Sequence, residues 1–203
     1  MIGANIIAVA SAFALATLFT WLMIRYAEKL GMMDSPNHRS LHEVPTPRSG
    51  GLAICIGIAV GFAYLIATDG NVPLIWLFGC AASVALISFL DDKYSLPPAP
   101  RMLVHLTAAA FFTLGVGMPT HLALPGIFWA WPPMVAIVFT ILFIAWMVNL
   151  YNFMDGMDGF AGGMTVVGFS CYAVIGALAN APSFSTASAV IAASALGLSL
   201  IHI

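Results

Sequence analysis

Four polar side chains, Asn149, Asn152, Asp155 and Asp158, recur every three residues between two long apolar segments. Asn offers neutral donors and acceptors, and Asp offers oxygen acceptors for a metal ion or a hydroxyl group. Each step of three turns a side chain by about 60° around a helix, so all four could not face one ligand on a regular helix. A glycine follows each aspartate and favours a break. We expect a last helical turn with the asparagines and then a loop that folds the aspartates inward; an ordinary polar turn is the alternative.

Asp91 and Asp92 form a second candidate site, directly after another apolar segment. Adjacent carboxylates repel each other unless a cation lies near them. A divalent metal ion, Lys93 or a cationic substrate group could supply that charge. Magnesium typically binds one or two carboxylates together with substrate phosphates. The alternative interpretation is a solvated polar helix end.

The segment DSPNHRSLHEVPTPRSGG, Asp34–Gly51, is the third polar stretch. Its three prolines exclude a continuous helix. Arg39 and Arg48 could hold phosphate oxygens, and His38 and His42 could join them. The segment could equally be an ordinary basic loop that only fixes the topology of a membrane protein.

These residues must be positioned by membrane helices, because the chain is 62% hydrophobic and only 7% charged. A soluble domain carries roughly 25% charged residues. The apolar segments are continuous rather than alternating, which predicts an all-α integral membrane protein and not a barrel. The net charge of -2 argues against a nucleic-acid partner. We expect about seven spans, at residues 5–24, 51–67, 73–90, 102–118, 133–148, 160–178 and 184–200.

All six basic residues fall in alternate connections between these spans, namely Arg25, Lys29, Arg39 and Arg48 after the first span and Lys93 and Arg101 after the third. The positive-inside rule makes that side cytoplasmic and places the N-terminus outside. The connection after the fifth span then lies on the same side. The sequence therefore predicts that the three polar stretches share the cytoplasmic face. Two isolated features are interpreted as structural: Gly57-x-x-x-Gly61 as close helix packing, and His105 as a satisfied polar group within the helix bundle.

Together, the motifs DSPNHRSLHEVPTPRSGG (Asp34–Gly51), DDKYSLPPAPR (Asp91–Arg101) and NLYNFMDGMDGFAGG (Asn149–Gly163) resemble the polyprenyl-phosphate N-acetylhexosamine-1-phosphate transferases. The wording is most similar to the O-antigen-initiating branch, the family 4 glycosyltransferases, and covers residues 1–197. The resemblance implies transfer of N-acetylhexosamine-1-phosphate from a UDP-sugar to undecaprenyl phosphate, with release of UMP. It implies a bacterial inner-membrane enzyme that starts O-antigen or other cell-envelope polysaccharide synthesis. Members of the family have ten or eleven helices.

The resemblance also implies roles for individual residues. Asp91 and Asp92 would be the catalytic pair, and Asn152, Asp155 and Asp158 would line the site of Mg²⁺, with Mn²⁺ as the alternative ion. Five residues would contact substrate: Asn149, Arg39, His42, Arg48 and Arg101. The family includes dimers, so a homodimer is an open alternative. A polytopic ion or solute transporter that uses the same acids is the competing function, because intramembrane acids at helix breaks also bind ions.

Two expectations concern the end of the sequence. A Gly-Asp loop and a His-rich loop of the family are not found in these 203 residues, so we expect the chain to be a C-terminally truncated transferase domain, inactive by itself. The last six residues, LSLIHI, match the translation of a common transposon-type sequencing adapter. We therefore interpret residues 198–203 as a non-native tail.

Overall fold

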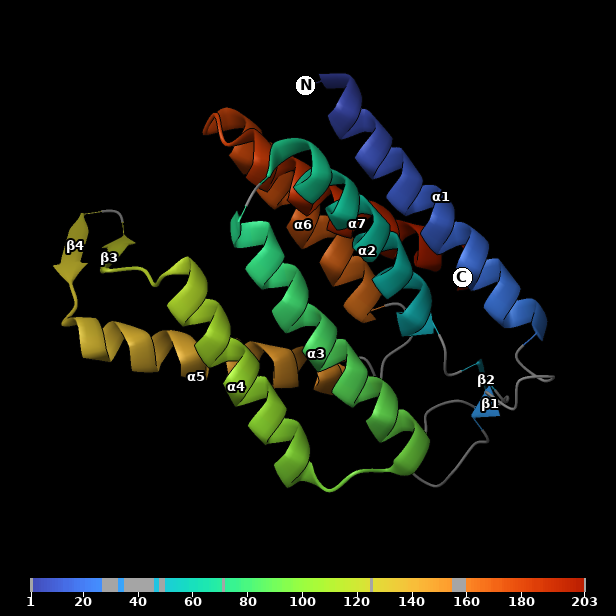
Figure 1. Cartoon of the computed structure of the whole chain (residues 1–203), viewed down its shortest axis with the longest axis horizontal. Coiled ribbons are helices and arrows are strands. Elements are labelled where there is room, and N and C mark those ends of the chain that lie inside the picture. Colours follow the sequence, from blue (N-terminus) through green and yellow to red (C-terminus); the bar gives the residue numbers. More distant parts are fainter. Residues whose placement is uncertain are drawn as a thin grey trace. The chain divides into compact units, whose positions relative to one another are not determined.

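The computed structural model of the chain describes residues 2–26, 33–34, 46–47, 50–70, 72–124, 126–154 and 160–202 (Figure 1). Helices make up most of it, which confirms the prediction of an all-α membrane protein. Two short antiparallel hairpins are added to the helices. In chain order the elements are α1 (Ile2–Tyr26), β1 (Met33–Asp34), β2 (Thr46–Pro47), α2 (Gly50–Asp69), α3 (Val72–Tyr94), α4 (Pro98–Val116), β3 (His121–Leu124), β4 (Ile127–Ala130), α5 (Pro133–Met154), α6 (Phe160–Leu178) and α7 (Pro182–His202).

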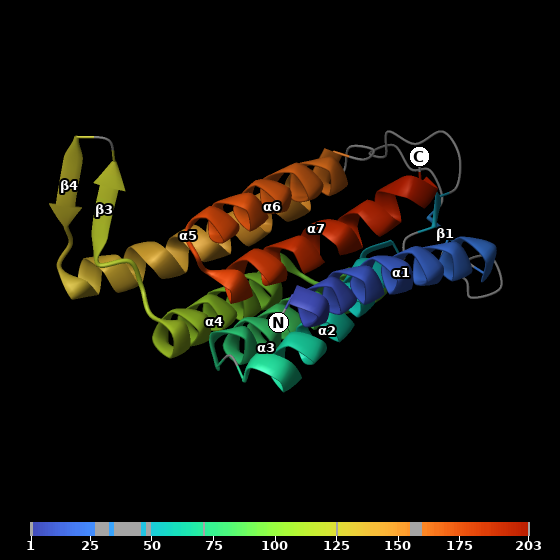
Figure 2. The same ribbon diagram turned by 90° about the horizontal axis from the view of Figure 1, so that it is seen from above.

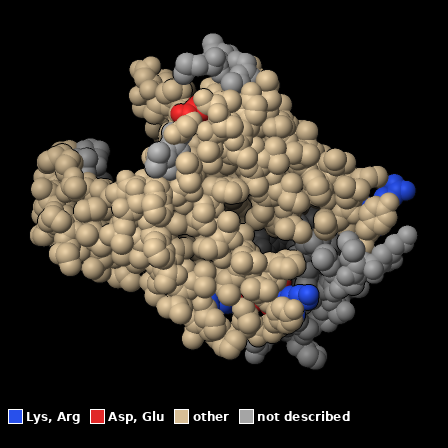
Figure 3. Space-filling model, viewed as in Figure 1, with Lys and Arg blue, Asp and Glu red and all other residues tan. Residues whose placement is uncertain are grey.

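A helix lies at each of the seven predicted spans. Among the described residues, six helices, α1 to α6, are long and apolar enough to cross a membrane, and α7 is not one of them. Serines and Thr186 in its first half lower the apolar character of α7. The face shown in Figure 3 is covered almost entirely by uncharged residues. The chain is therefore a multi-pass membrane protein.

One compact unit comprises residues 1–71 and 154–203 and contains α1, α2, α6 and α7. Small residues let α1, α2 and α7 approach each other closely. A Cβ added at Gly57 would lie 2.7 Å from the carbonyl oxygen of Ala12 and 2.8 Å from the Oγ of Ser194. At Gly61 an added Cβ would collide with Val190. This geometry confirms that Gly57-x-x-x-Gly61 serves helix packing.

The second unit, residues 72–153, contains α3, α4, the β3–β4 hairpin and α5. Helix α3 packs against α4, where Trp76 fills the space beside Gly115. The hairpin stands at the start of α5 (Figure 2). This unit holds every predicted site residue that the structure describes.

The connection between α3 and α4 is shorter than the sequence predicted. Asp91 and Asp92 lie inside the last turn of α3 rather than after it, and Arg101 lies in the first turn of α4 rather than in a loop. The predicted spans ended at residue 90 and began again at residue 102. However, Pro98 and Pro100 occupy the first turn of α4, where backbone N–H groups have no intrahelical partner and proline is tolerated.

The β3–β4 hairpin was not predicted; it lies between the predicted spans 102–118 and 133–148. Leu124 pairs with Ile127 across a two-residue turn in which Gly126 has a φ of +78°. Such a turn requires a residue that tolerates positive φ. The Pro-Gly dipeptide was the available signal. Trp129 on this hairpin is 67% exposed, as expected for an aromatic residue at a membrane interface.

Candidate active site

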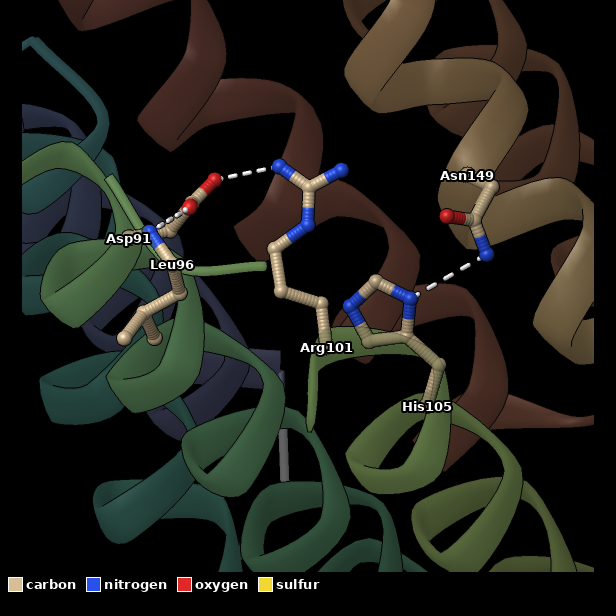
Figure 4. A network of polar contacts seen from close by, with 5 residues as sticks. All are labelled: Asp91, Leu96, Arg101, His105 and Asn149. Carbon is tan, nitrogen blue, oxygen red and sulfur yellow. Dashed lines mark hydrogen bonds and ion pairs between the residues drawn. The ribbon is translucent and has the colours of Figure 1, made fainter. Parts of the chain in front are cut away.

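Asp91 closes the turn between α3 and α4. Its carbonyl oxygen accepts a hydrogen bond from the N–H of Ser95 at 2.7 Å, and Ser95 takes the left-handed conformation with a φ of +48°. Its Oδ1 accepts a bond from the N–H of Leu96 at 2.8 Å, and its Oδ2 pairs with Nη1 of Arg101 (Figure 4). Both carboxylate oxygens are therefore used to hold the turn and the start of α4.

The ion pair between Asp91 and Arg101 is partly shielded from solvent, with side-chain exposures of 20% and 29%. Partial burial makes such a pair stronger than one on an open surface. Nε of Arg101 is buried, and no described residue accepts a hydrogen bond from it. The guanidinium carries five N–H donors, so hydrogens other than the one on Asp91 remain for a phosphate oxygen. Lys93, one of the cations expected beside the acid pair, instead lies 5.3 Å from the ring of Tyr94.

Asp92 has a different environment from Asp91. The two positions are about 100° apart around α3. Asp92 is exposed, whereas Asp91 is half-buried in the turn. The acid pair therefore divides into one carboxylate that organises the backbone and one that is accessible to a ligand.

Asn149, near the end of α5, is held by two acceptors. Its Nδ2 donates to the carbonyl oxygen of Ala145 at 2.7 Å and lies 3.1 Å from Nδ1 of His105 on α4. His105 is only 4% exposed. The prediction of His105 as a satisfied polar group within the bundle is confirmed. Its partner, however, is one of the predicted substrate-binding residues, and this contact was not predicted.

Asn152 lies one turn beyond Asn149 and is exposed. Both asparagines are in the final turns of α5, which confirms that part of the prediction. The remaining candidates lie outside the described residues: Arg39, His42, Arg48, Asp155 and Asp158. In the part of the chain that the structure describes, no group of three or more His, Cys, Asp or Glu residues could hold a metal ion.

Two side-chain contacts join the helix ends that carry these residues. Asp91 of α3 pairs with Arg101 of α4, and His105, one turn further along α4, contacts Asn149 of α5. Residues four apart lie on the same face of a helix, so Arg101 and His105 form a continuous polar face (Figure 4). The spacing of His105 from Arg101 was the signal in the sequence that could have assigned this histidine to the site.

Comparison with known proteins identifies the family of the chain. Residues 74–202 match the family model described as glycosyl transferase family 4. The chain belongs to glycosyl transferase family 4. This confirms the resemblance drawn from the three motifs. No solved structure matches the chain significantly.

Curated family 4 relatives extend over most of this chain. A probable undecaprenyl-phosphate N-acetylglucosaminyl 1-phosphate transferase of Bacillus subtilis (strain 168) is 32% identical over 97% of the chain and 56% of the relative. The undecaprenyl-phosphate alpha-N-acetylglucosaminyl 1-phosphate transferase of Escherichia coli (strain K12) is 31% identical over 81% of the chain and 45% of its own length. The Yersinia pestis protein of the same name is 28% identical over 80% of the chain and 45% of its own length. The chain thus spans about half the length of the curated relatives it matches.

Proposed function

We propose that this protein transfers N-acetylhexosamine-1-phosphate from a UDP-sugar to undecaprenyl phosphate and releases UMP. The observation that carries the proposal is the end of α3, where an exposed Asp92 stands beside an Asp91 that is fixed by Arg101 and Leu96. This is the acid pair that the family resemblance marks as catalytic. The printed names of the relatives supply the acceptor and the transferred group.

The chemistry is a phosphoryl transfer. An oxygen of the lipid phosphate attacks the β-phosphorus of the UDP-sugar, a new P–O bond forms, and the bond from that phosphorus to the bridging oxygen breaks. The electron pair leaves with UMP, and the product is a lipid-linked pyrophosphate. Such reactions depend more on positioning and charge neutralisation than on covalent help from the protein.

Asp92 is the candidate that meets the reacting groups. A phosphate monoester has a second pKa of about 6, so at neutral pH most of the lipid phosphate is already a dianion. The Asp92 carboxylate therefore removes a proton only from the monoanionic fraction. Arg101 supplies positive charge for a phosphate oxygen through guanidinium hydrogens not used on Asp91.

The side chains at this site offer the type of ligand atom that magnesium prefers, namely oxygen. Asp92 and Asn152 are exposed and offer oxygen atoms, the ligands that Mg²⁺ and Mn²⁺ prefer. Asp155 and Asp158 are the other proposed ligands. A bound Mg²⁺ would neutralise pyrophosphate charge. Asp91 is not proposed as a ligand, because both of its oxygens are engaged in the turn.

The proposed setting is the cytoplasmic face of the bacterial inner membrane, at the first step of O-antigen or another envelope polysaccharide. The distribution of basic residues supports this orientation. The proposed donor is a UDP-N-acetylhexosamine, with UDP-GlcNAc suggested by the names of the relatives. A homodimer remains a further proposal for the intact enzyme.

A transfer assay tests the function. Membranes containing the complete polypeptide encoded by the gene are incubated with UDP-GlcNAc labelled in the sugar, undecaprenyl phosphate and Mg²⁺. We expect label to enter the lipid fraction and UMP to appear in equal amount. The matched control is Asp92→Asn in the same membranes. Ion flux into liposomes without any transfer of sugar-phosphate would overturn the proposal in favour of a transporter.

A further inference from the structure

The amide of Asn149 has only one orientation that its neighbours allow. The carbonyl oxygen of Ala145 is purely an acceptor, so the Asn149 atom 2.7 Å away from it must be the nitrogen. An amide oxygen at that distance would be repelled. The amide group is thereby fixed without reference to any ligand.

The same nitrogen determines the state of His105. It lies 3.1 Å from Nδ1 of the imidazole, which can accept a hydrogen bond only if it carries no proton. His105 is then the neutral tautomer with its proton on Nε2. The sulfur of Met102, 3.8 Å from the nitrogen, is a weaker acceptor. The two N–H groups of Asn149 are thus directed to Ala145 and His105.

The amide oxygen of Asn149 is the polar atom that is left over. No described residue donates a hydrogen bond to it, and Asn149 is partly accessible to solvent. Figure 4 shows the oxygen on the side of the amide on which Arg101 lies. The network therefore presents an acceptor on α5 and a donor on α4.

We infer that His105 is a positioning residue that makes Asn149 a hydrogen-bond acceptor toward the substrate. Resting on the proposed function, this inference names the substrate group at Asn149: an electropositive one, either an N–H or O–H of the nucleotide sugar or the bound divalent cation. A phosphate oxygen is excluded at this position, because it would face another oxygen. Arg101 is the complementary residue, which takes a phosphate oxygen.

Nitrogen NMR on this chain tests the orientation without any need for activity. The chain is labelled with ¹⁵N-histidine and placed in lipid nanodiscs, and His105→Asn identifies the signal of His105 by its loss. We expect Nδ1 to be unprotonated and Nε2 protonated, and we expect Asn149→Leu to shift the Nδ1 signal. A protonated Nδ1, or an Nδ1 signal that Asn149→Leu leaves in place, would overturn the inference even if transfer is observed.

Kinetics of the complete polypeptide test the role. Partners that orient a ligating residue typically change activity by about 10- to 100-fold, so we expect His105→Leu to lower kcat/KM by that factor. His105→Asn keeps an acceptor near the place of Nδ1 and should recover most of the loss. In an Asn149→Leu background, His105→Leu should change the rate by less than about twofold, because coupled residues are not additive. Additive losses would mean that His105 acts by packing alone.

Two substitutions of Asn149 test whether its partner on the substrate is an electropositive group or a phosphate oxygen. Asn149→Asp keeps an oxygen toward the ligand, whereas Asn149→Leu removes it, so we expect the Asp variant to retain the higher kcat/KM. The reverse order is the result expected for a phosphate contact and would sink the inference. A raised KM for the UDP-sugar identifies a donor on the nucleotide sugar as the partner; a raised Mg²⁺ requirement identifies the cation. If the unmodified protein transfers nothing, the proposed function fails, and the NMR result alone decides the orientation.

Discussion

Arg101→Met removes the ion pair at the α3–α4 turn and leaves the methylene stem of the side chain in place. Hydrogen bonds to charged groups contribute about 1.5–3 kcal/mol when buried, and exposed ion pairs contribute about 0–1 kcal/mol. Asp91 and Arg101 are 20% and 29% exposed, which places this pair between the two cases. We expect the turn to lose about 1–2 kcal/mol of local stability, a factor of about 5 to 30 in its opening equilibrium.

Amide hydrogen exchange in lipid nanodiscs measures this loss directly. The N–H of Leu96 is bonded to Oδ1 of Asp91, so its protection depends on how firmly that carboxylate is held. Exchange in a peptide that covers Ser95 and Leu96 should accelerate by the factor given above, whereas the middle of α3 should be unchanged. Lys93→Met is the matched control, because it removes a positive charge from the same turn but not the partner of Asp91. Equal exchange in the Arg101→Met chain and the unmodified chain, or equal acceleration by Lys93→Met, would refute the reasoning.

Three further predictions follow from the same structure. Asp92→Asn should lower kcat by at least about 10- to 100-fold, the loss expected when a residue that supports a metal site is removed, with normal membrane insertion. Asp69→Asn, at the end of α2, should leave sugar-phosphate transfer within about twofold. Gly57→Ala should lower the thermal unfolding temperature of the purified chain by crowding Ala12, at a cost of about 1–3 kcal/mol; Gly79→Ala, where an added Cβ meets nothing within 4 Å, should not, and equal melting of the two variants would contradict the packing argument. Chelation of divalent ions should abolish transfer, Mg²⁺ should restore it and Ca²⁺ should restore less, because Mg²⁺ holds its ligands at shorter distances; full activity in excess chelator would remove the metal from the mechanism.

The helices could be predicted from the sequence because their signal is local. Each span is a continuous apolar segment of sufficient length, and the composition allows no other fold class. The predicted bounds of a helix were less accurate where a residue disfavours a helix in general but is tolerated in its first turn. Pro98 and Pro100 discourage a helix in general but are accommodated in a first turn, so the predicted start of α4 came several residues late. The β3–β4 hairpin depends on the pairing of His121–Leu124 with Ile127–Ala130, which no local apolar pattern reports.

The sequence selects candidate site residues but not the contacts between them. Asp91, Asp92, Asn149 and Asn152 could be selected because charged and amide groups at helix ends are conspicuous in a chain with 7% charged residues. Their partners could not be selected in the same way. The contact between Asn149 and His105 joins residues 44 positions apart, and it exists only because α4 and α5 bring these side chains together. The four-residue spacing from Arg101 was the available signal, and by itself it does not distinguish such a role from simple packing.

The pairing of Asp91 with Arg101 also changes the argument for a metal ion. Two adjacent carboxylates repel each other unless a cation lies near them. The candidates drawn from the sequence were a divalent ion, Lys93 or a cationic substrate group. Among the described residues, the cation paired with Asp91 is Arg101, ten residues further along the chain and one helix away. Because this pair already neutralises one of the two charges, the mutual repulsion of the acids no longer indicates a metal. The proposal of magnesium depends instead on the pyrophosphate chemistry and on exposed oxygen donors such as Asp92 and Asn152.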